Sequence, residues 1–189
     1  MKRMSDIVYA SVLLIFLSPL LLLIALCICI DSKGPVLFIQ QRVGLFGATF
    51  NIFKFRTMTV DPRRSESLVV QGSESSITRC GKILRRTHLD ELPQLWNVLI
   101  GNMSVVGPRP VSVAIFQIRE RELPTYKERL QIMPGITGLV QIKGREWHHK
   151  KSLRYAHKLN MFYAEHQSLS FDFWIICQTP RVMLNLMGR

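Results

Sequence analysis

Residues 7–30 read IVYASVLLIFLSPLLLLIALCICI, a run of apolar residues that contains no charged side chain. As a straight helix this run would be roughly 36 Å long at about 1.5 Å per residue, enough to cross a hydrocarbon layer of about 30 Å. A buried helix of a soluble protein is seldom so long and apolar on every face. The run therefore predicts a helix that enters a membrane.

Ser18 and Pro19 stand at the middle of this run. Proline removes a backbone hydrogen bond and clashes with the preceding turn, so a sharp bend is expected there. The hydroxyl of Ser18 can satisfy a carbonyl that the bend leaves without a partner. The pair predicts a break inside the helix.

Basic residues flank both ends of the run, Lys2 and Arg3 before it and Lys33 and Arg42 after it. A spanning helix would place one basic flank on the outer side, against the positive-inside tendency, whereas a bent re-entrant helix keeps both flanks on the cytoplasmic side. The residues alone leave these two topologies equally open. A cleaved signal peptide is a third reading, but no small-residue site closes the run.

The chain as a whole is strongly basic. It has 25 Lys and Arg against 13 Asp and Glu, a formal net charge of +12 over 189 residues. This balance indicates anionic partners, namely nucleic acid, an acidic membrane or a phosphorylated small molecule. The four cysteines form no CxxC pair, so neither a zinc site nor a disulfide framework is expected.

The elements expected after the run indicate an α+β fold of one domain. Residues 34–58 predict a β-hairpin, residues 59–76 a surface loop that could act as a lid, and residues 77–86 a helix with Ile83 and Leu84 inward. A second helix is expected from Asp90 to Gly101. The stretch 168–187, which carries Phe171, Phe173, Trp174 and Met183, suits either a helix in the membrane interface or a C-terminal core helix.

Asp90 and Glu91 are adjacent carboxylates in the stretch THLDELPQLW, residues 87–96. One interpretation is structural: Thr87 and Asp90 resemble a capping box, and Pro93 suits the first turn of a helix. Acidic groups at a helix start gain about 0.3–1 kcal/mol from the helix dipole. On this interpretation the two residues only begin a helix.

The other interpretation is chemical. The same placement, with Arg85 and Arg86 just upstream, lowers the pKa of a carboxylate and keeps it ionised. An ionised carboxylate that faces bound phosphates can serve as a nucleophile or as a Mg²⁺ ligand. The short motif alone does not decide between the two.

Three further motifs carry basic or glycine residues. In GPRP, residues 107–110, two prolines restrict Arg109, which suits phosphate recognition. In KFRTM, residues 54–58, Lys54 and Arg56 either bind anions or only snorkel from a strand. The turn PGITG, residues 134–138, would let the backbone approach a ligand closely, and Arg145 follows it.

The order and spacing of these motifs resemble the bacterial sugar transferase family, the small monotopic polyprenyl-phosphate phosphoglycosyl transferases. The matching elements are Ser-Pro inside the apolar run, GPVLFIQQRVG, KFRTM, LRRTHLDELPQLWNVLIGNMSVVGPRP, PGITGLVQIKGR and SLSFDFWII. They cover nearly the whole chain, and LDELPQLWNVL with MSVVGPRP is the most specific part.

The resemblance implies a monotopic membrane protein, with residues 1–32 as a re-entrant helix-break-helix anchor and residues 33–189 as a cytoplasmic catalytic domain at the bacterial inner membrane. It implies transfer of a sugar-1-phosphate from a UDP-sugar to undecaprenyl (polyprenyl) phosphate, with release of UMP. Asp90 would be the nucleophile and a ligand of Mg²⁺, and Glu91 its partner. The substrate-binding positions implied by the family's motifs are Arg56, Arg85, Arg109 and Arg145.

The chain departs from the family pattern in two places. Glu146 stands where an asparagine is common, and Asn160 stands where an aspartate precedes Tyr163. Both lie outside the LDE core, so they bear on sugar choice and local packing more than on reaction type.

Two other classes of function remain open, a membrane-bound nucleotide-sugar hydrolase and a non-catalytic basic adaptor at acidic lipids. A nucleic-acid partner is not expected, because the chain has no recognisable binding motif for one. The sequence leaves the sugar, the pathway and the oligomeric state open, a homo-oligomer included.

Overall fold

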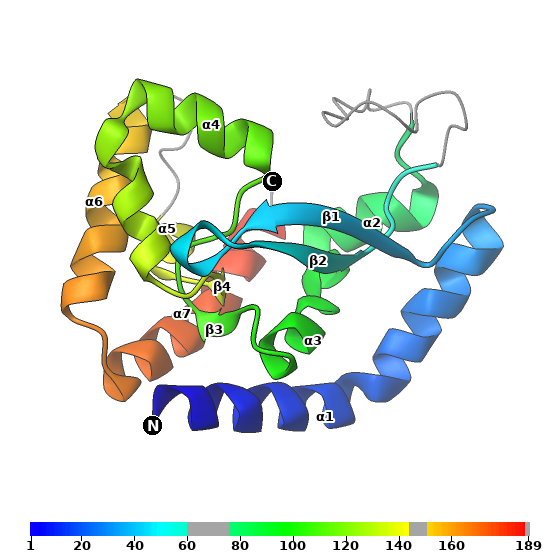
Figure 1. Cartoon of the computed structure of the whole chain (residues 1–189). Coiled ribbons are helices and arrows are strands. Elements are labelled where there is room, and N and C mark those ends of the chain that lie inside the picture. Colours follow the sequence, from blue (N-terminus) through cyan, green and yellow to red (C-terminus); the bar gives the residue numbers. More distant parts are fainter. Residues whose placement is uncertain (60–75, 144–150, 188–189) are drawn as a thin grey trace.

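The structure, a computed structural model, describes residues 1–59, 76–143 and 151–187 and confirms a fold of mixed helices and small sheets (Figure 1). Most of the expected surface loop and the predicted site residue Arg145 lie outside these ranges, as does Glu146. The elements are α1 (Lys2–Asp31), β1 (Leu37–Val43), η1 (Leu45–Gly47), β2 (Thr49–Phe55), α2 (Arg79–Thr87), η4 (Leu89–Glu91), α3 (Gln94–Leu99), β3 (Ser104–Val106), α4 (Val113–Glu122), η5 (Pro124–Gln131), β4 (Gly135–Thr137), α5 (Leu139–Lys143), α6 (Lys151–Glu165) and α7 (Leu169–Met187).

Helix α1 contains the whole apolar run and is 30 residues long. By length and composition it is the one described helix that could cross a membrane. Its axis changes direction near the middle, and Pro19 lies inside it (Figure 1). The Ser18 hydroxyl donates to the carbonyl oxygen of Ile15 at 2.8 Å, the carbonyl that an amide at position 19 would otherwise bind. The predicted bend and the predicted role of Ser18 are therefore confirmed, although the helix is bent rather than divided into two.

The first turn of α1 is bonded into the rest of the protein. Lys2 Nζ lies 2.5 Å from Asp172 Oδ2 on α7, and Arg3 donates to the carbonyl oxygens of Val98 and Leu99 at the end of α3. Asp6 is buried and accepts from the hydroxyl of Ser104, at 3.0 Å. The basic flank of the apolar run is thus an anchor point for two helices.

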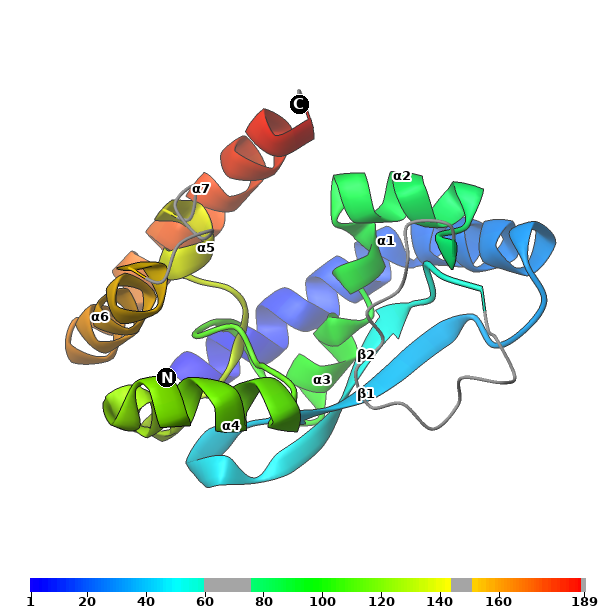
Figure 2. The ribbon, with the colours of Figure 1, turned by 90° about the horizontal axis from the view of Figure 1, so that it is seen from above.

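The last turn of α1 is held just as firmly. The buried Arg56 guanidinium donates to the carbonyl oxygens of Ser32 and Lys33, each at 2.7 Å, and Asp31 accepts from the backbone N–H of Cys80 at 2.8 Å. Both ends of α1 therefore bind the same folded body. Figure 1 shows α1 running along the lower side of that body, and Figure 2 shows α2 beside its second half.

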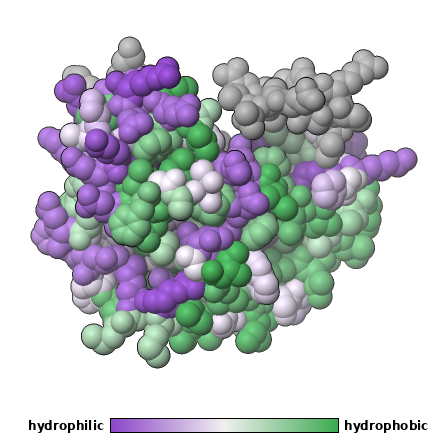
Figure 3. Space-filling model, viewed as in Figure 1, coloured by the Kyte–Doolittle hydropathy of each residue, from purple (hydrophilic) through white to green (hydrophobic). Residues whose placement is uncertain are grey.

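The middle of α1 is largely exposed. Long stretches of its side chains are exposed, among them Ile15, Phe16 and Leu22, each more than two thirds exposed. In Figure 3 apolar surface gathers on the lower and right-hand parts of the molecule, whereas polar residues cover the region of α4 and α6. An apolar helix whose two ends are bonded to the protein and whose middle is exposed requires an apolar environment around that middle.

The predicted hairpin is confirmed. Strands β1 and β2 pair antiparallel, from Leu37 opposite Phe55 to Val43 opposite Thr49. The turn is the short η1, in which Phe46 adopts a left-handed conformation with φ of 53°. The inner face of the hairpin reaches the main core through Ile52.

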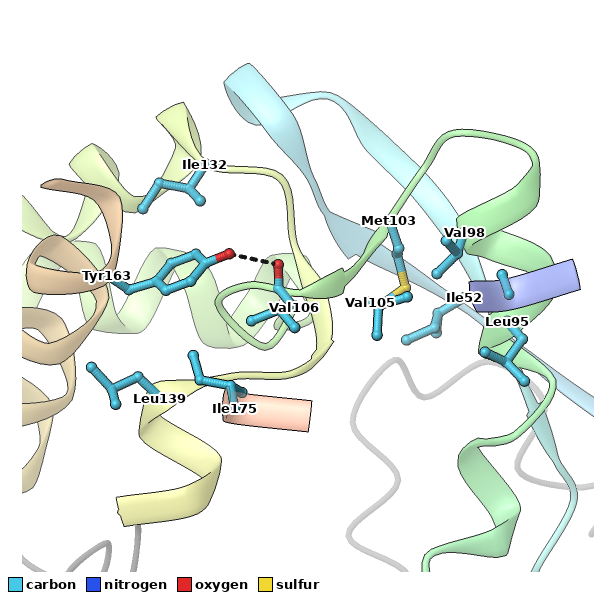
Figure 4. Close-up of a cluster of buried hydrophobic side chains, with 11 residues drawn as sticks. Ile52, Leu95, Val98, Met103, Val105, Val106, Ile132, Leu139, Tyr163 and Ile175 are labelled. Atoms are coloured by element: carbon cyan, nitrogen blue, oxygen red, sulfur yellow. Dashed lines mark hydrogen bonds between the residues drawn. The ribbon is translucent and has the colours of Figure 1, made fainter. Parts of the chain in front are cut away.

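The main core joins the N-terminal, central and C-terminal parts of the chain (Figure 4). Val98, Met103 and Ile175 are fully buried in it. The hydroxyl of Tyr163 points at the carbonyl of Val106, with 3.1 Å between the two oxygens (Figure 4). This core fixes β3, and with it the loop that follows, against α6 and α7.

Two expectations about the helices need correction, and α7 shows features of both of its alternatives. Leu84 is buried in α2 but Ile83 is 64% exposed, because the next position along a helix lies about 100° away and leaves the buried face. The helix expected from Asp90 is two elements, η4 and α3, since Pro93 has no N–H to continue the hydrogen bonding. In α7 the two alternatives are combined: Ile175 is in the core, whereas Phe173 and Trp174 are exposed.

The glycines expected to approach a ligand instead bring two backbone segments together. A Cβ atom built on Gly135 would lie 2.0 Å from the amide nitrogen of Gly107, and one on Gly138 would lie 2.3 Å from the carbonyl oxygen of Gly107. Strands β3 and β4, which flank this contact, pair in parallel. The motifs GPRP and PGITG are therefore packed directly on each other.

Candidate active site

The site is centred on Glu91, at the end of η4. Its side chain is 10% exposed and accepts from Lys54 Nζ on β2 at 2.6 Å and from Arg109 Nη1 at 2.8 Å. The other terminal nitrogen of Arg109 binds the second carboxylate oxygen, so the guanidinium engages Glu91 with both prongs. Three motifs that are distant in the sequence, KFRTM, LDELPQ and GPRP, meet at this carboxylate.

These contacts keep Glu91 ionised. Burial by itself raises the pKa of a carboxyl group, but the hydrogen bonds and charge of Arg109, followed by those of Lys54, lower the pKa of Glu91 to about 2. The prediction that basic neighbours keep this carboxylate charged is confirmed. The main neighbours are, however, Arg109 and Lys54, not the arginines just upstream.

Asp90 differs from Glu91 both in its hydrogen bonding and in the direction of its pKa shift. Its side chain is half-buried, and within the described residues its carboxylate has no hydrogen bond or ion pair. Burial and the adjacent charge of Glu91 raise the pKa of Asp90, against the opposing charges of Lys54, His88 and Arg109. The expectation of a lowered pKa was therefore wrong for Asp90, because burial and the charge of Glu91 outweigh the basic groups nearby.

The turn before Asp90 is also not the predicted capping box. Thr87 is the last residue of α2, and its hydroxyl donates back to the carbonyl of Ile83 at 2.8 Å. His88 then adopts a left-handed conformation with φ of 57°. A residue other than glycine in this region is strained by about 1 kcal/mol, and such strain is often found at functional sites. This turn separates α2 from η4 and places the two carboxylates beside β2.

Arg109 is held from both its ends. Its guanidinium binds Glu91, and its backbone carbonyl accepts from the guanidinium of Arg129 on η5. Its side chain is still 44% exposed although both terminal nitrogens of its guanidinium bind Glu91. The predicted restriction of Arg109 is confirmed in position, with a carboxylate of the protein as the bidentate partner.

The structure does not bring the other predicted arginines to Glu91. Arg56 binds the carbonyls at the end of α1, as described above. Arg85 is exposed, and its Nε donates to the hydroxyl of Thr57 at 2.9 Å. These contacts give both residues a structural role, and their binding of substrate stays a prediction, as does that of Arg145.

A cavity of about 460 Å³ lies beside Glu91 and Arg109. Several of its polar lining residues were not found from the sequence: Arg42, Arg119, Arg129, Tyr126, Gln141 and Asn160, the last known only as a departure from a family pattern. Their positions are spread over β1, α4, η5, α5 and α6. No local spacing links them, so only the tertiary fold reveals that they face one space.

The described residues contain no group of three or more His, Cys, Asp or Glu side chains that could hold a metal ion by themselves. Asp90 is the carboxylate at this site whose oxygens are uncommitted. Mg²⁺ is commonly bound by one or two carboxylates together with the phosphates of a substrate. The donor set therefore fits a Mg²⁺ ion shared between Asp90 and a phosphorylated ligand.

A half-buried free carboxylate, an ionised partner and an arginine-lined cavity, on one body with a long apolar helix, define a protein suited to phosphorylated ligands at a membrane. The profile of the family described as bacterial sugar transferase matches residues 1–186. The chain belongs to this family, as the resemblance in its motifs indicated.

Three curated relatives show how far the similarity extends. The chain is 47% identical over 145 residues to a UDP-glucose:undecaprenyl-phosphate glucose-1-phosphate transferase of Klebsiella pneumoniae, covering 76% of this chain and 31% of the relative. A protein of the same name from Caulobacter vibrioides is 47% identical over 143 residues, covering 76% and 54%. A UDP-N-acetylgalactosamine-undecaprenyl-phosphate N-acetylgalactosaminephosphotransferase of Aeromonas hydrophila is 36% identical over 187 residues, covering 99% and 44%. The chain thus spans between about a third and about half of these relatives.

Proposed function

We propose that the protein is a phosphoglycosyl transferase that moves a sugar-1-phosphate from a UDP-sugar to undecaprenyl (polyprenyl) phosphate and releases UMP. The observation that carries the proposal is the contrast at the site: Asp90 is half-buried and has no hydrogen-bond or ion-pair partner among the described residues, whereas its neighbour Glu91 is fully paired. The family and the names of the relatives support the same reaction. Such a transfer is an early membrane step in the assembly of a polysaccharide or another glycoconjugate.

The reaction proceeds in two displacements. In the first, a carboxylate oxygen of Asp90 attacks the sugar-linked phosphorus, the bond from this phosphorus to the bridging oxygen breaks, and UMP leaves. The phosphosugar then stays on Asp90 as an acyl phosphate. In the second, an oxygen of the lipid phosphate attacks the same phosphorus, the bond to Asp90 breaks, and the carboxylate is regenerated. This is covalent catalysis that divides one difficult step into two.

The residues around Asp90 have separable tasks. Glu91 holds Lys54 and Arg109 beside the nucleophile, and the positive charge of these two residues stabilises negative charge on the transferring phosphoryl group. Partial burial of Asp90 removes water that would solvate the attacking oxygen. Mg²⁺, held by Asp90 and the substrate phosphates, would further neutralise the phosphates.

We also place α1 in the cytoplasmic membrane as a re-entrant anchor, with the catalytic domain facing the cytoplasm. Both ends of α1 are bonded to one folded body, through Lys2 and Arg3 at one end and Ser32 at the other. A straight spanning helix would separate its ends by the thickness of the bilayer. The bend at Pro19 allows both ends to stay on one side, with membrane lipids around the exposed middle.

Release of UMP by the purified full chain in nanodiscs tests the proposed reaction. Mg²⁺ and a panel of UDP-sugars are supplied, beginning with UDP-glucose and UDP-N-acetylgalactosamine, with undecaprenyl phosphate present or omitted. We expect sustained release only with the lipid, and at most a stoichiometric burst without it. Sustained release without lipid would favour a hydrolase, and no release from folded protein with any sugar would favour the non-catalytic adaptor.

A further inference from the structure

The cavity beside Glu91 lies between the GPRP loop and the helices of the C-terminal half. Its lining comes from α4, η5, α5, α6 and α7, which surround the upper and left-hand part of the molecule in Figure 1. Much of the wall is aliphatic, with Ile115 on α4, Val140 on α5 and Leu153 on α6 as examples. A volume of about 460 Å³ is within the usual range of small-molecule sites, roughly 300–1,000 Å³.

The charges on this lining do not balance. Four arginines line it, but Glu91 is the only carboxylate among the described lining residues, and Glu91 is already bonded to Arg109 and Lys54. Arg129 is 7% exposed and donates to the hydroxyl of Tyr126 and to the carbonyl of Arg109. A buried guanidinium without a carboxylate partner is costly, and an anion bound in the cavity removes that cost.

Arg119 stands next to Arg129 at the same tyrosine. It donates to the Tyr126 hydroxyl at 3.1 Å, and its guanidinium carbon lies 5.9 Å from the centre of the ring, while that of Arg129 lies 4.8 Å from it. Tyr126 is 1% exposed and therefore fixes both guanidinium groups in place. Two cations held together by a neutral ring form a preorganised anion site.

Two amide side chains line the same cavity and have no partner in the described part of the chain. Asn160 is 7% exposed, and no hydrogen bond joins its side chain to the described residues. Both polar atoms of the Gln141 amide are buried and unpaired. A buried amide that lacks hydrogen bonds costs free energy, which a ligand with its own donors and acceptors would recover.

We propose that this cavity binds the nucleoside monophosphate part of the donor substrate, with its phosphate on Arg119 and Arg129 and its heterocyclic base against Gln141 and Asn160. This inference rests on the proposed function, which supplies a nucleotide as leaving group. A polyprenyl phosphate would satisfy the arginines but would leave both amides unpaired. A nucleobase presents donors and acceptors on a flat body that suits the aliphatic walls.

Binding of UMP to the full chain in nanodiscs, measured by calorimetry, tests the assignment without turnover. Arg119→Gln should weaken UMP at least about tenfold and leave uridine unchanged. Asn160→Leu and Gln141→Leu should each weaken both UMP and uridine severalfold and leave inorganic phosphate unchanged. The matched controls are Arg121→Gln and Gln131→Leu, exposed residues outside the cavity lining, which should bind UMP as the wild type does.

The outcomes separate this assignment from the proposed reaction. UMP affinity that is the same in all the folded variants, or no UMP binding by the wild type, would overturn the cavity assignment. Loss of undecaprenyl phosphate binding with normal UMP binding would also overturn it and give the cavity to the lipid. UMP binding that depends on these residues, in a protein without lipid-dependent turnover, would support the assignment and count against the transferase. Thermal unfolding of each variant shows whether it is folded.

Discussion

Two ionic clusters connect distant parts of the chain. They differ in that the second contains an additional carboxylate, which has no partner among the described residues. At the foot of α1, Lys2 bonds Asp172 at 2.5 Å, and the Tyr163 hydroxyl donates to the other oxygen of Asp172 at 2.6 Å. At the candidate active site, Lys54 and Arg109 bond Glu91 in a similar way, but Asp90 beside them has no partner in the part of the chain that the structure describes. We call the first cluster closed, because both oxygens of its carboxylate are bonded, and we call Asp90 in the second cluster the open carboxylate.

The difference teaches which charges are available for chemistry. A carboxylate whose two oxygens both accept hydrogen bonds gains stability and loses nucleophilic freedom, as Glu91 and Asp172 do. Asp90 has the opposite balance, because the fold raises its pKa and so penalises its ionised form. Perturbed carboxylates cluster at functional sites, and this one also has oxygens without a partner among the described residues, so Asp90 and not Glu91 is the proposed nucleophile.

The largest expected effect, on UMP release, comes from replacing the open carboxylate of Asp90. Asp90→Asn should lower UMP release by at least about a thousandfold, because the amide cannot form the acyl phosphate. The free energy of unfolding should stay the same or rise, since ionised Asp90 is disfavoured in the fold. Chemical denaturation in detergent, together with the UMP assay, measures both.

A loss of activity accompanied by a comparable loss of stability would show that Asp90 is structural. Asn102→Ala is a suitable control for a nearby substitution, because Asn102 is half-buried and lies outside the cluster. Normal turnover in Asp90→Asn would show that Asp90 is not the nucleophile and that this residue only begins a helix.

The second largest effect, on the free energy of unfolding, comes from replacing the paired carboxylate of Glu91. Glu91→Gln leaves Lys54 and Arg109 without their counter-charge, so the free energy of unfolding should fall by about 3 kcal/mol. Lys54→Met in the same chain should restore part of this loss, because it removes one of the orphaned charges. A double-mutant cycle by denaturation provides the coupling energy, and an additive result would contradict the ionic account.

The closed cluster at α1 should respond in stability alone. Lys2→Met removes the ion pair with Asp172 and should cost about 2 kcal/mol of unfolding free energy, because Lys2 is only partly buried. Lys33→Met, at the exposed other flank of α1, should cost little. Denaturation midpoints compare the two variants, and UMP release by Lys2→Met should remain near that of the wild type. A fall in turnover much larger than the fall in folded protein would place this cluster in the catalytic machinery.

Much of this fold can be read from the sequence because its signals are local. The apolar run, the position of Pro19 and the alternation of the hairpin each depend on residues that are close in the chain. Ile83 was misplaced because one position on a short helix changes the face by about 100°. The division of η4 from α3 was missed because Pro93 suits a first helical turn as well as a break.

The site is harder to predict because its partners come from distant segments. Asp90 and Glu91 were found from one short motif, but that motif could not show that Glu91 alone would take both cations. Lys54 and Arg109 are far apart in the sequence and meet at Glu91 only in the tertiary structure. The cavity arginines lie on separate elements, so charge counting predicted an anion without locating it.

The smallest expected effect is a displaced pH profile, and it separates the two carboxylates without removing either. Asp90 must be ionised to attack, and burial together with Glu91 raises its pKa above the ordinary 3.8, so kcat/KM should fall on acidification from a pH above that value. Glu91, with a pKa of about 2, stays ionised there and cannot cause the fall. The ionised Glu91 stabilises the fold above its ordinary pKa of 4.5, and this stabilisation is lost only as the pH drops toward 2.

Lys54 lowers the pKa of Asp90, so Lys54→Met should move the acid limb upward by less than about one pH unit. An acid limb at 3.8 that does not move in Lys54→Met would mean that the group titrating in catalysis is not the open carboxylate.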